Sequence, residues 1–195
     1  MAASPPGDEC DEDLMLAYAH GSPAAFDALY ARHKGGVYRY LLRHCGNAGI
    51  ADELFQDIWM SVIRGRDRYA PTARFASWLY TLAHHRIVDH WRASGQAALV
   101  PIDVEDPASE TVPGPPRDEP EARALHRETA ARLRAALAAL PPAQRDAFLL
   151  QQESGLSLAE IAQLTGVGVE TVKSRLRYAL ARLRTELPEL REGLR

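Results

Sequence analysis

A run of cationic and hydrogen-bonding side chains near the C-terminus has the chemistry of a DNA-binding surface. Between Lys173 and Arg184 the chain carries five Lys or Arg residues and no Asp or Glu. Such side chains bind backbone phosphates, and arginine can also donate two hydrogen bonds to the edge of a guanine. The candidate DNA contacts on this stretch are Glu170, Thr171, Lys173, Ser174, Arg175, Arg177 and Tyr178.

Two helices joined by a tight turn are predicted to position these side chains. Ser157 and Glu160 have the spacing of a capping box, so a helix is expected to begin directly after Ser157. Gly166 is expected to end it, because glycine readily adopts the left-handed conformation of a helix C-terminus. A second helix is predicted from about Val169, with Gly168 as a weaker N-cap. This arrangement is typical of a helix-turn-helix, whose second helix enters the major groove. A helical hairpin with a solvated charged face would show the same pattern.

A second cluster interleaves aromatic rings with cations in the stretch FASWLYTLAHHRIVDHWR, residues 75–92. The aromatic residues are Phe75, Trp78, Tyr80 and Trp91, and the residues interleaved with them are His84, His85, Arg86, His90 and Arg92. Bases stack on aromatic rings while cations meet phosphates, so this pattern suits single-stranded DNA. The alternative is that the apolar side chains of this helix belong to the core. That is expected for some of them, namely Phe75, Leu79 and Leu82.

The helix predicted over residues 50–64 has two faces of different character. Its inner face is expected to carry Ala51, Leu54, Ile58 and Val62. On its outer face Met60 and Ile63 lie among the polar side chains of Asp52, Glu53 and Gln56, with Trp59 at the edge. Apolar groups among carboxylates indicate a protein partner. Another helix of the same domain could equally cover them.

The histidines between residues 84 and 90 match no metal or catalytic site. His85 and His90 are five residues apart, whereas the helical zinc pair has a four-residue spacing. No nearby Cys or Glu completes a ligand set. The sequence also lacks a carboxylate pair, a nucleophile elbow and a phosphate-binding loop. We therefore expect no metal, no cofactor and no enzymatic activity.

The composition fits a folded protein whose charges are segregated along the chain. The 195 residues are 46% hydrophobic and 25% charged, and a net charge of −3 argues against indiscriminate coating of nucleic acid. Five acids cluster between Asp8 and Asp13, far from the basic run. Cys10 and Cys45 form no CxxC, which indicates a reducing compartment. Neither a signal peptide nor a membrane span is expected, so a cytoplasmic location is predicted.

The predicted elements are all helical and divide into two domains. Helices are expected at residues 11–20, from 23 to the loop that begins at Cys45, and at 50–64, 75–92, 121–140, 143–154, 158–165 and 169–184, with no strand. Residues 1–10 are expected to be disordered. Residues 95–120 read as a flexible linker, because six of the thirteen prolines lie there with six acids and one arginine. The expected fold class is all-α, with small helical domains at 11–94 and 121–195.

Four stretches, in this order, resemble a bacterial RNA polymerase sigma factor of the extracytoplasmic-function (ECF) type. The family's first segment is similar to GSPAAFDALYARHKGGVYRYLLR, and its polymerase-docking segment is similar to ADELFQDIWMSVIR. The segment that melts and reads the −10 promoter element is similar to FASWLYTLAHHRIVDHWR. The domain that reads the −35 element is similar to LPPAQRDAFLLQQESGLSLAEIAQLTGVGVETVKSRLRYALARLR. Together these stretches cover nearly everything except the N-terminal tail and the linker.

The resemblance implies partners and residue roles. By this resemblance, the residues that contact the β′ clamp helices of the polymerase core would be Asp52, Glu53, Gln56, Asp57 and Met60. Contact with the −10 element would fall to Arg68, Arg74, Trp78, His85, Arg86 and Asp89, and contact with the −35 element to the C-terminal candidates. The β flap and an anti-sigma factor are further implied partners, and the linker would thread the polymerase channels. His85 and Gly168 stand where the family often has asparagine and serine, which bears on −10 preference and on the start of the reading helix.

The function that the resemblance implies is promoter-specific initiation of transcription by a sigma factor, associated with the nucleoid when bound to polymerase. The C-terminal domain would anchor on duplex DNA, and the N-terminal domain would capture bases that leave the stack. The alternative is a stand-alone helix-turn-helix regulator that binds operator DNA as a dimer. The lack of a heptad pattern and the outward face of residues 52–63 argue against that alternative.

Overall fold

The computed structural model of the protein describes residues 9–94 and 120–187, but not the side chains of residues 120–127. Within these ranges the chain forms helices and loops and no β-strand, so the predicted all-α class is confirmed. The predicted disordered segment 1–10 and linker 95–120 lie outside the described residues, except for residues 9, 10 and 120. Pro120 begins a helix instead of ending the linker, because the first turn of a helix tolerates proline.

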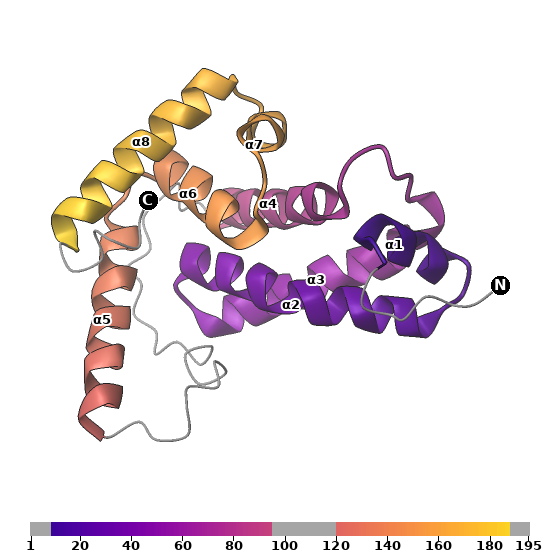
Figure 1. The fold of residues 1–195 in the computed structure, drawn as a ribbon, viewed down its shortest axis with the longest axis horizontal. Helices are drawn as coiled ribbons and strands as arrows, with labels where there is room; N and C mark the ends of the chain where they lie inside the picture. The colour runs from indigo at the N-terminus through magenta and orange to yellow at the C-terminus, as the bar shows by residue number, and fades with distance from the viewer. Residues whose placement is uncertain (1–8, 95–119, 188–195) are drawn as a thin grey trace.

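The described residues form eight α-helices and one 3₁₀ turn (Figure 1). They are α1 Asp11–Ala19, α2 Pro23–Cys45, α3 Ala48–Gly65, η1 Arg66–Arg68, α4 Phe75–Ala93, α5 Pro120–Ala138, α6 Pro142–Ser154, α7 Leu158–Thr165 and α8 Val169–Glu186. Each predicted helix boundary lies within two residues of the observed one.

The N-terminal body consists of α1 to α4, packed around an apolar core. Side chains that are fully buried in it include Leu29, Leu41, Ile58, Phe75 and Leu79. They come from α2, α3 and α4, which pack against one another, and α1 lies across α2 (Figure 1). The core therefore fixes how α3 and α4 present their outer faces.

Acidic side chains of α1 tie it to α2 and to the start of α4. The Asp11 carboxylate lies 2.8 Å from the Arg32 guanidinium and 2.7 Å from the His33 imidazole. Glu12 Oε1 accepts a hydrogen bond from the backbone N–H of Phe75 at 2.5 Å. The first turn of a helix leaves its amide groups without intrahelical partners, so Glu12 satisfies one of them. Asp11 therefore ties α1 to α2, and Glu12 ties α1 to the N-terminus of α4.

The C-terminal body consists of α5 to α8 and contains the predicted helix-turn-helix. Ser157 accepts from the backbone N–H of Glu160, and Glu160 accepts from that of Ser157, so both halves of the capping box are present. Gly166 ends α7 at a φ of 68°, a conformation that glycine adopts at little cost. The turn leads through Gly168, the N-cap of α8. The buried residues of α8 are Val172, Leu176, Ala179 and Leu183, which lie on the side of the helix that faces α6 and α7.

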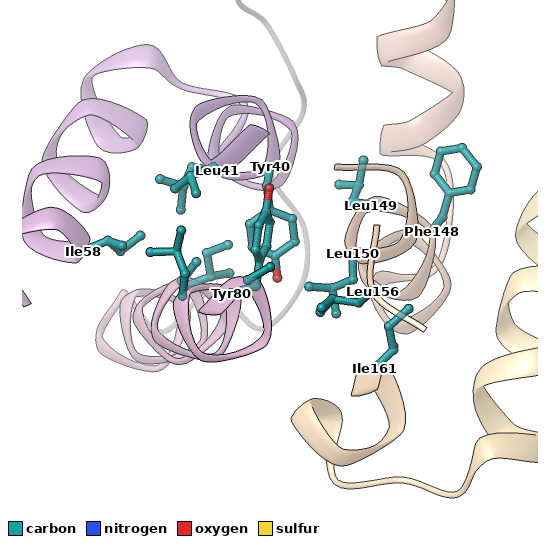
Figure 2. Packing of buried hydrophobic residues seen from close by; sticks show 14 of the residues in the cluster. Tyr40, Leu41, Ile58, Tyr80, Phe148, Leu149, Leu150, Leu156 and Ile161 are labelled. Carbon is teal, nitrogen blue, oxygen red and sulfur yellow. The ribbon is translucent and has the colours of Figure 1, made fainter. Parts of the chain in front are cut away.

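The two bodies pack directly against each other, with α6 lying on α2 and α4. In Figure 2 the rings of Tyr40 and Tyr80 lie on the side of α2 and α4 that faces α6, opposite Leu149 and Leu150. All four side chains are buried. The apolar core is thus continuous from one body to the other.

Three carboxylates of the C-terminal body add polar contacts to this packing. Asp146, Glu153 and Glu160 each accept hydrogen bonds from side chains on α2 or α4. The sequence did not predict this contact, because it left the relative placement of the two bodies open.

A matched pair of substitutions on α3 tests the assignment of its faces. Ile58 is 0% exposed and Met60 is 42% exposed. Ile58→Ala should lower the free energy of unfolding by about 2–5 kcal/mol, because it removes buried methyl groups and leaves a cavity. Met60→Ala should change it by less than about 0.5 kcal/mol. Urea denaturation followed by circular dichroism measures both, and equal losses would contradict the assignment.

Candidate nucleic-acid interface

The N-terminal half of α8 presents the predicted −35 contacts towards solvent. The exposed ones are Glu170, Thr171, Lys173, Arg177 and Tyr178, and the partly buried ones are Ser174 and Arg175. Tyr178 is 53% exposed, a large fraction for an aromatic side chain. The opposite side of α8 packs on α6 and α7. The structure therefore brings all seven candidates together on one helix that projects from the C-terminal body (Figure 1).

Two local contacts order this face of α8. Lys173 Nζ lies 2.6 Å from Glu170 Oε1, one helical turn away. An exposed pair of this kind contributes at most about 1 kcal/mol, so a DNA phosphate can replace the carboxylate. The Arg177 guanidinium lies over the Tyr178 ring, 5.0 Å from its centroid. This cation–π contact limits the freedom of a flexible side chain and presents it beside the ring.

The outer face of α4 carries three of the predicted −10 contacts. His85, Arg86 and Asp89 are exposed along it. Trp78 is only partly exposed, and its ring centroid lies 5.2 Å from that of Tyr69 in a T-shaped arrangement. This packing fixes the indole and leaves only part of it for a stacked base.

Several apolar side chains of α4 belong to the core, as the alternative interpretation expected. Phe75 and Leu79 are fully buried, and Leu82 is partly buried against the same core. Tyr80 is also buried, at 1% exposure. Its hydroxyl faces α6, so this aromatic side chain joins the two bodies and is not available to DNA.

The two arginines that precede α4 have different surroundings. Arg68 is exposed in η1. Arg74, the N-cap residue of α4, donates from Nη1 to the carbonyl oxygen of Gly155 at 3.3 Å. The same nitrogen lies 3.6 Å from Glu160 Oε2. One predicted −10 contact is therefore engaged by the C-terminal body in this structure.

The outer face of α3 carries the predicted polymerase contacts, all of them exposed. They are Asp52, Glu53, Gln56, Asp57 and Met60. Trp59, expected at the edge of this face, is instead 5% exposed and packs against the rings of Phe26 and Tyr30. The alternative that another helix covers the face is not observed among the described residues. What remains is a surface of carboxylates around one thioether side chain.

Asp146 is a largely buried carboxyl group of α6 that faces two histidines. Tyr40 Oη donates to it at 2.8 Å, and His44 Nε2 and His84 Nδ1 each lie 3.3 Å from its oxygens. Burial raises the pKa of Asp146, but the His44 and His84 imidazoles lower it by more than burial raises it. The pKa of this carboxyl group therefore lies well below its usual range. The interaction therefore stabilises the fold above the unfolded pKa of about 3.9, and this contribution is lost as the pH falls.

The histidine cluster does not gather further ligands around it. Among the described residues no group of three or more His, Cys, Asp or Glu side chains could hold a metal ion. None of the described helices is both long and apolar enough to cross a membrane.

Sequence reasoning missed the residues that join the two bodies. Glu153 bonds Arg43 across 110 positions of the chain, and Ser77 bonds Glu160 across 83. Helical periodicity relates only residues three or four apart, so it cannot pair these side chains. The available signal was weak: Asp146 and Arg145 are charged residues that directly precede a buried apolar run in α6.

Both bodies match known protein families. The family model of Sigma-70 region 2 matches residues 29–96, which span α2 to α4. The family model of Sigma-70, region 4 matches residues 130–183, from α5 to α8.

Two characterised proteins are similar over nearly the full chain. The RNA polymerase sigma factor CarQ of Myxococcus xanthus is 32% identical over 176 residues, which cover 90% of this chain and 97% of CarQ. The ECF RNA polymerase sigma factor SigM of Mycobacterium tuberculosis is 30% identical over 184 residues, covering 94% and 88% of the two chains.

A solved structure shares the arrangement of helices. The sigma factor RpoE of Bartonella quintana, determined in complex with the anti-sigma factor NepR, superposes with a TM-score of 0.64. The match covers 84% of this chain and 96% of that chain at 19% sequence identity. At this identity the likeness shows the fold alone.

Proposed function

Because the chain belongs to the ECF family of RNA polymerase sigma factors, we propose that its two helical bodies divide promoter recognition between them. The protein is a sigma factor that directs promoter-specific transcription. The observation that supports this proposal is that α8 has a basic, exposed face and α3 has an acidic, exposed face. The alternative of a stand-alone regulator is not favoured, because the similarity spans both bodies.

The C-terminal body, residues 121–195, reads the −35 element in this proposal. The exposed N-terminal half of α8 enters the major groove, with Arg177 and Tyr178 near base edges and Lys173 at a phosphate. The weak Glu170–Lys173 pair exchanges its carboxylate for the phosphate. The packing of α8 on α6 and α7 supports this role, because it holds the reading helix rigidly.

The N-terminal body, residues 11–94, opens and reads the −10 element. His85, Arg86 and Asp89 line an exposed face of α4 that can meet bases that leave the stack. Arg68 and Arg74 add positive charge for the displaced strand, and the rigid edge of Trp78 offers an aromatic contact. Opening selects sequence because weakly stacked steps cost less to separate.

Docking on the polymerase core uses the outer face of α3. Exposed carboxylates around Met60 suit a basic surface with an apolar centre, such as the β′ clamp helices would supply. The C-terminal body would lie near the β flap, and residues 95–120 would connect the two bodies through the polymerase channels.

An anti-sigma factor is a further proposed partner, since the similar structure of RpoE contains the anti-sigma factor NepR. Sigma factors are not an enzyme class, and we assign no catalytic residue. The relatives act on RNA polymerase in the cytoplasm, and association with the nucleoid follows if the holoenzyme forms.

Reversing two charges on α3 tests the docking face. Asp52→Lys with Asp57→Lys should abolish co-purification with the polymerase core, because like charges would then oppose a basic partner. Circular dichroism should stay unchanged, since both side chains are exposed. The matched control is Asp13→Lys with Asp27→Lys, which makes the same charge change on exposed positions of α1 and α2. Retained binding by the α3 variant would remove the docking assignment.

Two substitutions on α8 separate base reading from phosphate binding. Arg177→Ala should relax selectivity at one position of the −35 element by about 1–3 kcal/mol, if the guanidinium makes paired base contacts. Lys173→Ala should weaken binding to all sequences alike and reduce the salt dependence by about one phosphate contact. Reconstituted holoenzyme on promoters varied in the −35 element gives both results. An unchanged promoter profile for Arg177→Ala would exclude its reading role.

A further inference from the structure

We propose that the chain has a binding site for a small aromatic carboxylic acid, in a cavity of about 220 Å³ between α4 and the N-terminal end of α6. The carboxylate of the ligand pairs with the Arg145 guanidinium, and its ring lies against apolar side chains of α4. None of the side chains that line the cavity is assigned a contact with DNA or with the polymerase core. The inference therefore goes beyond the proposed function and does not depend on it.

The apolar wall of the cavity comes from α4 and from the first turn of α6. Ile87, Val88 and Trp91 lie on α4, and Pro142 and Ala143 lie on α6. Ile87 is buried, and the other two side chains of α4 are partly buried. Since an apolar cavity of about 150 Å³ holds one benzene molecule, this one has room for an aromatic ring that carries a carboxylate. The indole of Trp91 offers that ring a flat apolar surface.

Arg145 is the polar side chain that selects an acid. It is 7% exposed and lines the cavity, and its Nε is buried with no hydrogen-bond partner among the described residues. A buried charge that has lost its hydration without gaining a partner is costly. A ligand carboxylate would provide that partner, because the planar guanidinium can donate two parallel hydrogen bonds to such a group.

The titration of Arg145 supports this interpretation. Burial lowers the pKa of the guanidinium, and the charge of Asp146 raises it. The pKa nevertheless lies below its usual range, so the loss of hydration outweighs the nearby negative charge. The surroundings of Arg145 therefore compensate for its charge only in part, and a bound anion would complete the compensation.

The N-terminal end of α6 adds a second preference for an anion. The helix begins at Pro142, and no side chain caps it. The first amide groups of a helix have no intrahelical partners, and the positive end of the helix dipole lies there. Because Pro142 and Ala143 line the cavity, an anion bound to Arg145 would lie close to this end of α6.

Asp146 also lines the cavity, and its charge would oppose an anion. That charge is already compensated by other groups. Tyr40 donates a hydrogen bond to Asp146, and the imidazoles of His44 and His84 lie 3.3 Å from its oxygens. These three groups serve Asp146, whereas Arg145 remains to receive the ligand.

The same features disfavour other classes of ligand. A metal cation would be repelled by Arg145. Inorganic phosphate would gain nothing from the wall formed by Ile87, Val88 and Trp91. A sugar or a nucleotide would need more polar partners than this wall offers, because unpaired hydroxyl groups are costly to bury. An aromatic acid matches both the apolar wall and the single guanidinium.

Calorimetric titration of the full-length protein with 2-naphthoate tests the site. The alcohol 2-naphthalenemethanol has a similar shape without the charge, and acetate has the charge without the rings. 2-Naphthoate should bind about 10- to 100-fold more tightly than the alcohol, as expected for hydrogen bonds between charged groups. Acetate should not bind at the same concentration. Absence of 2-naphthoate binding at millimolar concentration, or equal affinity for the alcohol, would overturn the proposal.

Replacement of Arg145 separates the charge from the shape of the cavity. Arg145→Met should bind the acid and the alcohol equally, because it keeps an apolar side chain and removes the guanidinium. It should fold at least as stably as wild type, since the change removes a buried charge. Arg182→Met is the matched control on an exposed position of α8, and it should keep the preference for the acid. An unchanged preference in Arg145→Met would overturn the role of the guanidinium.

A larger side chain at Val88 tests the location. Val88→Phe places a ring in the cavity and should abolish binding of both 2-naphthoate and the alcohol. Val169→Phe makes the same change at a 38% exposed position of α8, which does not line the cavity, and should leave both affinities unchanged. Unchanged binding by a folded Val88→Phe protein would overturn the location.

Tryptophan signals locate the ligand in the unmodified protein. The chain has three tryptophans, and Trp91 is the one that lines the cavity. Trp59 packs against Phe26, and Trp78 packs against Tyr69. In ¹H–¹⁵N NMR spectra, 2-naphthoate should shift the indole N–H signal of Trp91 and leave the other two in place. An unshifted Trp91 signal at saturating 2-naphthoate would overturn the site.

An acidic segment of the chain itself is the alternative occupant. Residues 102–106, with the sequence IDVED, combine apolar and acidic side chains and lie outside the described residues. The test compares the wild-type chain with the triple variant Asp103→Asn, Glu105→Gln and Asp106→Asn. Equal affinity for 2-naphthoate supports a small-molecule site. Binding by the triple variant alone would show that this segment occupies the cavity, and would overturn the proposal.

Discussion

The packing of α6 against α2 and α4 is the contact on which the arrangement of the whole molecule depends. It buries the Glu153 carboxylate, which is stable there only because Arg39 and Arg43 compensate for its lost hydration. Gly36 supplies the space. Since the compensating groups belong to the other body, separation returns each of them to water and leaves none buried without a partner.

The surfaces that would meet larger partners divide into two groups around this contact. The acidic outer face of α3 and the basic outer face of α8 are both exposed while the bodies are packed together. The side of α4 that we propose to meet DNA is different, because Arg74 and Ser77 contact Glu160. Part of that side of α4 is therefore occupied by the C-terminal body in this structure.

Much of the fold could be predicted because its signals are local. The capping box of Ser157 and Glu160, the left-handed turn at Gly166 and the apolar period of α8 all act between residues a few positions apart. The same holds for the outer face of α3, where Met60 is exposed as its period predicts. Trp59 was placed less well, at the edge of that face. It is buried because Phe26 and Tyr30 of α2 pack against it, and no pattern within α3 contains that information.

The sequence by itself determined the helices, their inner and outer faces, the helix-turn-helix and the family, because helix formation and amphipathic burial depend on neighbours three or four residues apart. Only the tertiary structure decided that Asp146, Glu153 and Glu160 face the N-terminal body. It also decided that Tyr80 bonds the backbone of Glu153 and that Arg74 bonds the backbone of Gly155. Those contacts join residues 73 to 114 positions apart. Their formation depends on how two finished bodies fit together, and that fit is a property of shape and charge that no local pattern encodes.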